Sequence, residues 1–189
     1  MSIECRIVYF DKVGRRNTDE TLQIARRRAD ELGIKKAAIA SVTGYTARKA
    51  MDVFAGFYVV IVTAHTGWSK PDLQSFPEDL RKELEAKGWP VLTSPHVFGG
   101  ISYAMRDMFN TAMLGVDLGN TLRILGQGMK VVCEVAMSAA DAGLLRTDEE
   151  VVSIGGTNVG ADTAAILKPV HVHQFFDLRV KEILCKPRL

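Results

Sequence analysis

The sequence lacks the features that define several large classes of protein. It has only three cysteines, Cys5, Cys133 and Cys185, which lie far apart without a CxxC pair. This spacing predicts neither redox chemistry nor a zinc knuckle, so we expect reduced, buried thiols. The longest apolar run, residues 54–64, is far too short to cross a bilayer, and charged residues interrupt the N-terminal segment where a signal peptide would need its apolar core. We therefore expect a cytoplasmic protein with no membrane partner.

The chain also lacks an excess of charge of either sign. Its 24 lysines and arginines nearly balance 22 aspartates and glutamates, which leaves a net charge of +2. A dedicated nucleic-acid binder normally has a strong basic excess, so we expect no nucleic-acid partner. The sequence has no repeats or low-complexity linkers. A length of 189 residues with 47% hydrophobic content suits a single domain over residues 1–189.

Strand-like and helix-like segments alternate along the chain. Short apolar segments typical of buried strands are residues 3–10, 37–40, 57–63, 89–93, 151–154 and 164–167. Segments with apolar residues at helical spacing are residues 18–32, 47–54, 78–87, 101–113 and 131–144. Residues 180–184 are a candidate edge strand, and residues 171–176 are ambiguous. Because parallel neighbours need crossover connections, this alternation predicts an α/β fold: a three-layer αβα domain with a mostly parallel sheet.

Two of these helices give more detailed expectations. Ser75 and Glu78 have the spacing of a capping box at the start of the third helix. The fourth helix has an apolar stripe that we expect to lie in the core, made by Ala104, Met105, Met108, Phe109, Ala112 and Met113. The alternative is that its methionines form an oligomer interface, so a homo-oligomer is an open expectation.

The strongest candidate site is a hydroxyl-rich turn that follows the strand at 37–40 and opens a helix. It comprises Ser41, Thr43, Gly44, Tyr45 and Thr46. Backbone N–H groups at a helix start attract anions, and Ser or Thr hydroxyls add donors around phosphate oxygens. The turn therefore predicts that a phosphorylated small molecule binds here. Because Ser and Thr are also common helix caps, an ordinary capped turn is the alternative.

A glycine-rich segment after the strand at 151–154 is a second candidate. It lacks both the Lys-Ser/Thr ending of the nucleoside-triphosphate loop and the spacing of the dinucleotide fingerprint, which argues against ATP hydrolysis and Rossmann-type NAD binding. Its glycines would let a ligand approach the backbone, and its polar side chains could hydrogen-bond that ligand. An ordinary turn is the alternative. The residues assigned to this segment are Gly155, Gly156, Thr157, Asn158, Asp162 and Thr163.

Two further loops follow strands and belong to the same predicted rim. In α/β sheets, ligands bind in the crevice beyond the carboxyl ends of the strands. A planar aromatic ligand could stack on an aromatic side chain of these loops, although a lone Trp, Phe or His in a loop is more often a packing residue. The candidates are His65, Thr66, Gly67, Trp68, Phe98, Gly99 and Gly100, together with Asn17 at the start of the first helix.

The sequence assigns no metal site and no catalytic residue. His171 and His173 alternate as two ligands on one strand would, but no Cys, Asp or Glu cluster completes a four-coordinate set. No pair of residues has a spacing that compels an acid/base role. Arg15 and Arg16 are most simply solvated, although either could reach a phosphate on the rim.

Several segments, read in order, resemble the C-terminal α/β domain of pyruvate kinase. They are the helix ending at Gly33, residues 37–48, the strand at 58–63, residues 88–92 and the later Gly156-Thr157-Asn158. The resemblance spans most of residues 3–168 and implies a pyruvate kinase C-terminal domain-like fold. In that family, a Ser/Thr-Gly loop in the place of residues 41–46 holds a phosphate of the sugar-bisphosphate regulator.

Two departures limit what this resemblance implies. The chain is too short to include a catalytic barrel of about 250 residues, and a helical insertion at about residues 101–144 is not part of the enzyme's domain. Pyruvate kinase activity is therefore not expected. Stand-alone microbial proteins to which the sequence is similar are associated with bound flavin mononucleotide (FMN) and no assigned reaction, so the resemblance implies an FMN-binding flavoprotein that could be an oxidoreductase. The alternative is a non-catalytic sensor that binds a sugar phosphate or a nucleotide.

Overall fold

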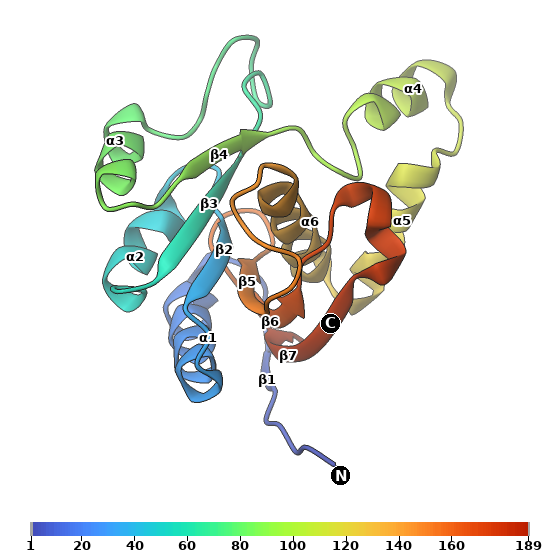
Figure 1. Cartoon of the computed structure of the whole chain (residues 1–189). Helices are drawn as coiled ribbons and strands as arrows, with labels where there is room; N and C mark the ends of the chain where they lie inside the picture. The colour runs from blue at the N-terminus through green and yellow to red at the C-terminus, as the bar shows by residue number, and fades with distance from the viewer. Residues whose placement is uncertain (1, 189) are drawn as a thin grey trace.

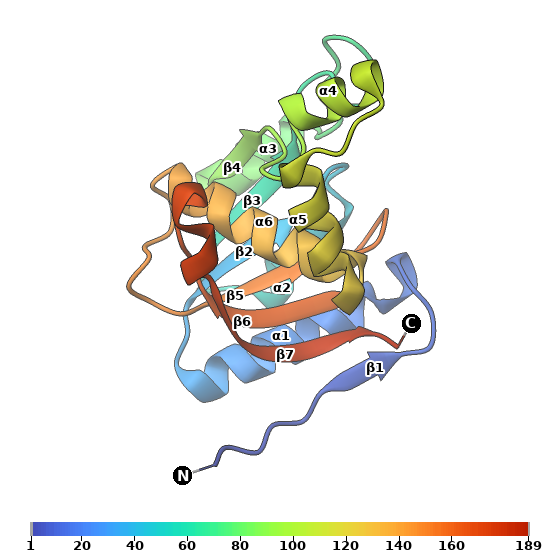
Figure 2. The same cartoon turned by 90° about the vertical axis from the view of Figure 1, so that its right-hand side faces the viewer.

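Seven strands form one sheet between two layers of helices in the computed structural model, which describes residues 2–188 (Figures 1 and 2). The strands lie in the order β1-β7-β6-β5-β2-β3-β4. Neighbours are parallel except for the pairs β5–β6 and β6–β7, which confirms a mostly parallel sheet. The strands are β1 (Val8–Phe10), β2 (Lys36–Ala40), β3 (Tyr58–Ala64), β4 (Val91–Ser94), β5 (Val151–Gly155), β6 (Thr163–Lys168) and β7 (Arg179–Pro187).

The helices cover both faces of this sheet, which confirms the three-layer αβα arrangement. The first three helices pack on one face, α6 packs on the other, and α5 lies outside α6 (Figure 2). The α-helices are α1 (Thr18–Leu32), α2 (Tyr45–Val53), α3 (Glu78–Ala86), α4 (Ile101–Phe109), α5 (Leu114–Leu122) and α6 (Gln127–Asp141). Short 3-10 helices are η1 (Arg15–Asn17), η2 (Arg123–Leu125) and η3 (Val172–Asp177). Among the described residues, no helix is both long and apolar enough to span a bilayer.

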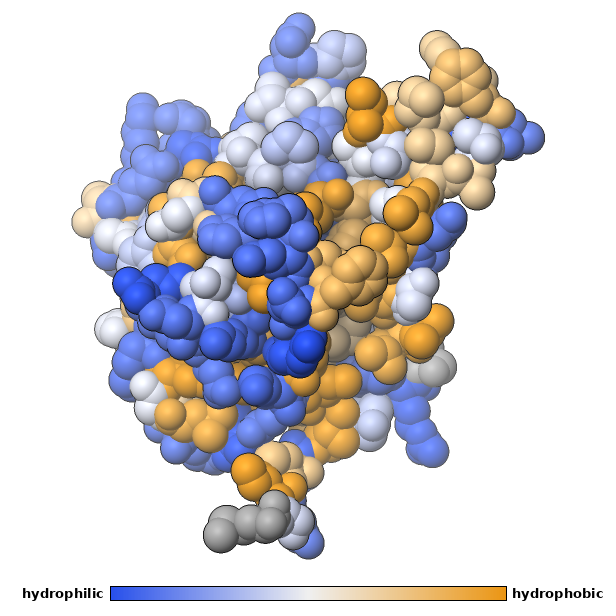
Figure 3. Space-filling view, turned by 45° about the vertical axis from the view of Figure 1, so that its right-hand side comes forward, coloured by the Kyte–Doolittle hydropathy of each residue, from blue (hydrophilic) through white to orange (hydrophobic). Residues whose placement is uncertain are grey.

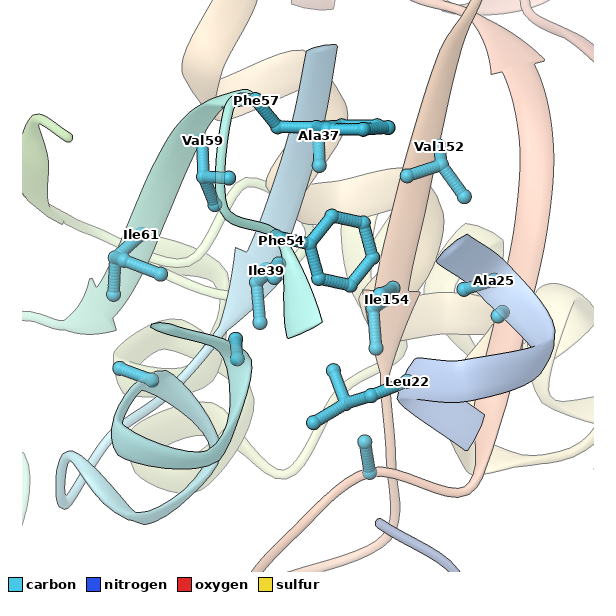
Figure 4. Packing of buried hydrophobic residues seen from close by; sticks show 14 of the residues in the cluster. Leu22, Ala25, Ala37, Ile39, Phe54, Phe57, Val59, Ile61, Val152 and Ile154 are labelled. Atoms are coloured by element: carbon cyan, nitrogen blue, oxygen red, sulfur yellow. The ribbon is translucent and has the colours of Figure 1, made fainter. Parts of the chain in front are cut away.

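Alternating side chains of the central strands lie in two separate cores, one on each face of the sheet. In β2, Ala37 and Ile39 face α1 and α2, whereas Ala38 faces α6. Figure 4 shows the first of these cores, where Phe54 lies among aliphatic side chains of the sheet and of α1. Burying one such large apolar side chain contributes roughly 1.5–3 kcal/mol. The continuous apolar runs of β2 and β3 follow from this double burial.

The order of the last strands differs from the sequence prediction. β7 was expected at an edge of the sheet, but it lies between β6 and β1, and β1 is the edge strand. β1 is also only three residues long, with Tyr9 exposed. Hydropathy shows that a segment is strand-like, but it does not set which strand becomes its neighbour, so this prediction was wrong.

The expected capping box at α3 is absent. Pro77 occupies the N-cap position, and no side chain caps the helix. Ser75 instead shares a hydrogen bond with Ser69, at 3.3 Å between their Oγ atoms. Glu78 and Asp79 in the first turn still favour the helix start, because their charges oppose the positive end of the helix dipole.

The expectation that α4 lies in the core was wrong. None of its residues is buried. The helix ends at Phe109, and the next residue, Asn110, has a left-handed φ of 46°, so the stripe does not continue to Met113. α4 projects from the body of the protein (Figures 1 and 2). Figure 3 shows apolar atoms gathered on this side of the molecule. The exposed large apolar residues of α4, α5, η2 and η3 form what we call the insertion surface: Ile101, Met105, Met108, Phe109, Leu114, Ile124, Leu125 and Phe176.

Candidate functional site

One cavity lies at the carboxyl ends of β2, β3, β4 and β5. Its volume is about 320 Å³, and the loops after all four strands contribute to its wall. These strands run in the same direction, so their carboxyl ends meet at one edge of the sheet. Helix α6 closes the side opposite α2, and Tyr103 of α4 also contributes. The topology therefore brings together the four loops that the sequence singled out, in the usual place for a ligand in such sheets.

The start of α2 forms one pole of the cavity. Gly44 has a φ of 82°, which lets the chain turn sharply from β2 into the helix, and its missing side chain makes room for Leu80. Ser41 Oγ accepts a hydrogen bond of 3.2 Å from Ala47 N. Within residues 2–188, the amides of Tyr45 and Thr46 donate to no protein acceptor. Such amides at a helix start suit an anion.

Hydroxyl and cationic side chains add to this α2 pole. Thr43 and Thr46 line the cavity, and Ser41 still has its hydroxyl proton to donate. Arg15 stacks on the Tyr45 ring, with its guanidinium carbon 4.0 Å from the ring centroid. No carboxylate of the described chain pairs with Arg15. The pole therefore combines unpaired amides and hydroxyls, and the Arg15 guanidinium lies next to it on the Tyr45 ring without lining the cavity.

The glycine-rich segment contributes less than the sequence suggested. Gly156 and Asn158 line the cavity, and Asn158 is left-handed with a φ of 60°. Asp162 is fully buried and accepts hydrogen bonds from Gly14 N at 2.8 Å and from Thr163 Oγ1 at 2.8 Å. It also accepts one from Thr157 N at 3.2 Å. Asp162 thus ties the segment to the loop before α1 and has a structural role in this arrangement.

The glycines of this segment make room for protein atoms. A Cβ on Gly155 would lie 2.9 Å from the Val131 side chain of α6. A Cβ on Gly156 would lie 2.5 Å from the carbonyl oxygen of Gly160. Gly155, Thr157 and Thr163 do not line the cavity. Close packing of the backbone therefore explains these glycines without a ligand.

The loop after β3 places one aromatic side chain at the cavity. Trp68 lines it and is half-exposed. His65 lies behind Trp68, with 5.6 Å between the ring centroids, and its Nδ1 is 2.8 Å from the carbonyl oxygen of Thr66. Neither Thr66 nor Gly67 reaches the cavity, because both belong to the turn that carries Trp68. This loop therefore offers an aromatic wall.

The remaining sequence candidates lie away from the cavity. Phe98 is buried and packs on Phe175, with 5.6 Å between ring centroids. Gly99 lies against the Tyr103 ring, and Gly100, with a φ of 50°, precedes α4. Asn17 is buried, and its Nδ2 donates to the carbonyl oxygen of Lys12 at 2.7 Å. None of these four candidates lines the cavity.

Three charged or polar residues that were not among the site candidates form a second pole, although one of them, His96, lies in a loop that the sequence singled out. Lys130 and Glu134 lie one turn apart on α6, line the cavity, and are only 4% and 7% exposed. Lys130 Nζ donates to Glu134 Oε2, and His96 Nδ1 lies 3.3 Å from the same oxygen. We call these residues the α6 pole. Two opposite charges four residues apart in an otherwise apolar helix were the signal that could have found it.

Glu134 is held as a carboxylate in this buried place. Burial alone would raise the pKa of Glu134, but the hydrogen bond from His96 and the charge of Lys130 outweigh burial and hold the pKa below its ordinary value. The Phe98 amide also lies 3.4 Å from Glu134 Oε1. A buried ion pair with several hydrogen bonds is rigid, and removing one partner would leave an uncompensated charge.

Arg123 adds a further cation to this side of the cavity. Its Nε donates to Gln127 Oε1 at 2.5 Å, and its Nη1 donates to Asn120 Oδ1 at 2.6 Å. Both partners are neutral amides. The charge of Arg123 is therefore not neutralised by a carboxylate within the described chain, which favours an anionic occupant.

The two buried thiols and the C-terminal histidines offer no competing site. The third thiol, Cys5, is exposed, so the expectation that all three are buried was wrong. Burial raises the pKa of Cys133 and of Cys185 to about 12, so both are poor nucleophiles at neutral pH. His171 stacks on His173 and lies 3.1 Å from Asp141 Oδ1. Over residues 2–188, no group of three or more His, Cys, Asp or Glu side chains is arranged to hold a metal ion.

Comparisons with known proteins find one family model and several solved structures that are similar to this chain. The family model described as the pyruvate kinase alpha/beta domain matches residues 19–168. A pyruvate kinase of Cryptosporidium parvum is 14% identical, with 79% of this chain and 22% of that chain covered and a TM-score of 0.41. Another structure, C. parvum pyruvate kinase in complex with ADP, is 13% identical, with 89% and 23% covered and a TM-score of 0.39.

The alignments cover 22% and 23% of these two pyruvate kinase chains. This chain therefore spans about a fifth of the length of the pyruvate kinases that it matches. The family match includes β2, the turn at Ser41 and the start of α2, as well as the whole of α6 and β5. Since this match extends over most of the sequence, the chain belongs to the family of the pyruvate kinase alpha/beta domain.

Proposed function

We propose that the cavity binds a phosphorylated small molecule, with its phosphate at the α2 pole. The observation that carries this proposal is the pair of unpaired amides at Tyr45 and Thr46, which open onto the cavity beside the hydroxyls of Thr43 and Thr46. A phosphate accepts several hydrogen bonds at once, and charge-assisted bonds are about twice as strong as neutral ones. Arg15 on the Tyr45 ring adds a charge that suits a dianion.

The occupant that we propose first is FMN. The α2 pole suits its phosphate, and Trp68 offers an aromatic surface for a planar ring system. Asn158 and Gly156 also line the cavity, and they offer polar groups to the ribityl chain. Trp68 lines the cavity of about 320 Å³ and is half-exposed, which leaves room for part of the ring to stay outside. When bound, FMN would supply electron or hydride transfer, and this chain's residues would hold it and tune its environment.

A non-catalytic sensor for a sugar phosphate or a nucleotide is the second candidate. The α2 pole favours any phosphate ester, so it does not by itself select a flavin. The two candidates differ at the far end of the ligand, because a sugar phosphate has no planar ring to place against Trp68. The identity of the bound molecule therefore decides between them.

The direct experiment is to identify what the protein carries after purification. The chain is expressed without added flavin, purified, denatured, and the released small molecules are separated and identified by mass spectrometry. We expect FMN, together with visible flavin absorbance in the native protein. A matched preparation of Thr43→Ala combined with Thr46→Ala should carry clearly less flavin per chain.

Two results would count against parts of this proposal. A colourless protein that releases a sugar phosphate or a nucleotide would contradict FMN as the occupant but support the phosphate site. A protein that releases nothing and binds none of FMN, sugar phosphates or nucleotides in calorimetric titrations would remove the phosphate site as well.

A further inference from the structure

The wall of the cavity that α6 forms is polar along one stripe. Gln127, Lys130, Glu134 and Ser138 follow one another at helical spacing, and all four line the cavity. Several apolar residues between them pack on the sheet. Lys130 and Glu134 pair with each other inside the protein. The N-terminal end of the stripe differs, because the charge found there has no such partner.

That charge belongs to Arg123, in the short helix η2 just before α6. Arg123 lines the cavity. Two of the five N–H donors of its guanidinium group bond the neutral side-chain oxygens of Gln127 and Asn120, so three remain. No carboxylate of the described chain forms an ion pair with Arg123. The charge state of His96 does not alter this, because His96 contacts Glu134.

Arg123 also fixes the orientation of the Gln127 side chain. A guanidinium group only donates hydrogen bonds, so the side-chain oxygen of Gln127 must face Arg123. The side-chain nitrogen of Gln127 then lies on the other branch of the amide, and within residues 2–188 it bonds no acceptor. We call Arg123 and Gln127 the η2 corner. Its free groups are N–H donors, which suit a group that only accepts hydrogen bonds.

The η2 corner and the α2 pole lie on opposite sides of the sheet edge (Figure 2). Ala47 and Ala50 of α2 belong to the core on one face of the sheet. Val132 and Val135 of α6 belong to the core on the other face. A phosphate held at the start of α2 therefore leaves Arg123 free to bind a second acidic group.

We propose that the η2 corner is a second subsite of the cavity, which binds a carboxylate. A carboxylate accepts two parallel hydrogen bonds from a guanidinium group, and its single negative charge matches the one uncompensated charge of Arg123. Gln127 adds a neutral donor beside it. The inference rests on the proposed function, since it assigns a carboxylic acid to the contents of the same cavity. The acid belongs either to the phosphorylated occupant or to a second small molecule that binds beside it.

The first arm of the test places the acid on the phosphorylated compound. Calorimetric titrations of the full chain compare 3-phosphoglycerate with glycerol 3-phosphate, and 6-phosphogluconate with sorbitol 6-phosphate. Within each pair the phosphate is the same, and a carboxylate replaces a hydroxymethyl group. The two pairs differ in length, so that a short and a longer span between the subsites are both covered.

The second arm places the acid on a separate molecule. The α2 pole is first saturated, once with inorganic phosphate and once with FMN, so that an added acid cannot bind there. Succinate is then compared with succinamide, and benzoate with benzamide. We expect the acid of at least one pair in the two arms to bind about tenfold more tightly than its neutral match, as expected for hydrogen bonds between charged groups. The arm in which this occurs identifies the source of the acid.

Two substitutions assign this preference to the η2 corner. Arg123→Gln removes the charge, and Gln127→Glu places a carboxylate beside Arg123 that neutralises it. Each should reduce the preference for the acid to within about twofold. Arg123→Lys keeps the charge without the planar fork and should keep part of the preference. The control is Arg146→Gln, because Arg146 is exposed and already paired with Asp148; it should leave the preference as in wild type.

The outcomes separate this inference from the phosphate site. No preference for the acid in any pair would overturn the inference, and so would a preference that survives Arg123→Gln. An equal loss of acid and neutral compound in Arg123→Gln, with folding checked by thermal unfolding, would overturn it as well. Thr43→Ala combined with Thr46→Ala should weaken both members of a phosphorylated pair and leave their ratio unchanged. If it weakens neither, the phosphate site is wrong, while a ratio that depends on Arg123 still supports the carboxylate subsite.

Discussion

Two helices from the same stretch of sequence, α4 and α6, have opposite environments. Each contains two methionines among other apolar residues. In α6, most residues are buried between the sheet and α5, including Met137, which is fully buried. In α4, no residue is buried, and Met108 is 77% exposed. Helical spacing of apolar residues therefore predicts a helix in both places, but it does not predict what covers the apolar face.

The two helices also differ in where their charged pairs lie. α6 buries Lys130 and Glu134 as a pair beside the cavity. In α4 the adjacent Arg106 and Asp107 pair at the surface. Surface pairs contribute little to stability, whereas a broken buried pair is costly. Changes in α6 should therefore affect both folding and the cavity, and changes in α4 should affect neither strongly, except at Tyr103, which lines the cavity.

The largest effect is expected when the buried pair in α6 is broken. Glu134→Ala should lower the free energy of unfolding by roughly 3–5 kcal/mol, because it leaves the Lys130 ammonium buried without its carboxylate. Urea denaturation measures this loss. The control is Lys130→Met combined with Glu134→Leu, which removes both charges and should recover much of the stability. A Glu134→Ala protein as stable as wild type would show that the pair is solvated in solution.

The same pair predicts a pH dependence of stability. The folded protein holds the pKa of Glu134 below its ordinary value of 4.5. The stabilisation from Glu134 is therefore fully present above about pH 4.5 and lost as the pH falls through the lowered pKa. The stability difference between wild type and Glu134→Gln should shrink over this acidic range. A difference that grows on acidification would contradict the assigned direction.

A matched pair of methionine substitutions tests the contrast in packing. Met137→Ala should cost roughly 2–5 kcal/mol, because it leaves a cavity in a core with no exposed surface at that position. Met108→Ala should change stability by no more than about 0.5 kcal/mol. Thermal and urea unfolding of both variants give the comparison. Similar losses would mean that α4 is covered in solution by something that packs as tightly as the sheet covers α6.

A substitution on the insertion surface is expected to have the smallest effect on stability but a clear effect on the molecular mass in solution. Its charges balance, with Arg106 and Arg123 against Asp107 and Asp117, so no charge of one sign selects a partner. A second copy of this chain would present the same apolar surface. We expect light scattering to give a mass above the 20.8 kDa of one chain, and Met108→Glu to reduce it toward the monomer. A wild-type monomer at high concentration would remove the oligomer prediction.

The fold was largely predictable from the sequence, for identifiable reasons. β2 and β3 are continuous apolar runs, and α1 begins at Thr18 and ends before Gly33, whose φ of 70° suits a helix end. Residues 131–144 were predicted as a buried helix, and α6 confirms it. The order of β1 and β7 was not predictable, because it depends on contacts between segments that lie far apart in the chain.

The candidate site was predictable only in part. The turn after β2 and the loops after the other strands follow from the parallel topology, which brings Ser41, Trp68 and Asn158 to one cavity. The α6 pole was missed, because Lys130 and Glu134 lie on a helix far along the chain. Candidates such as Asp162 were chosen for their chemistry, and the structure shows that protein donors already use that carboxylate. Whether any of these residues contacts a ligand stays a prediction.

The most direct test of this account is a pair of FMN titrations, one with wild-type protein freed of any bound flavin and one with Thr43→Ala combined with Thr46→Ala. The account predicts that the double substitution weakens FMN at least about tenfold, since it removes hydroxyl donors to a charged group, and leaves riboflavin binding unchanged. Equal affinity of both proteins for FMN, or equal losses for FMN and riboflavin, would contradict a phosphate held at the start of α2.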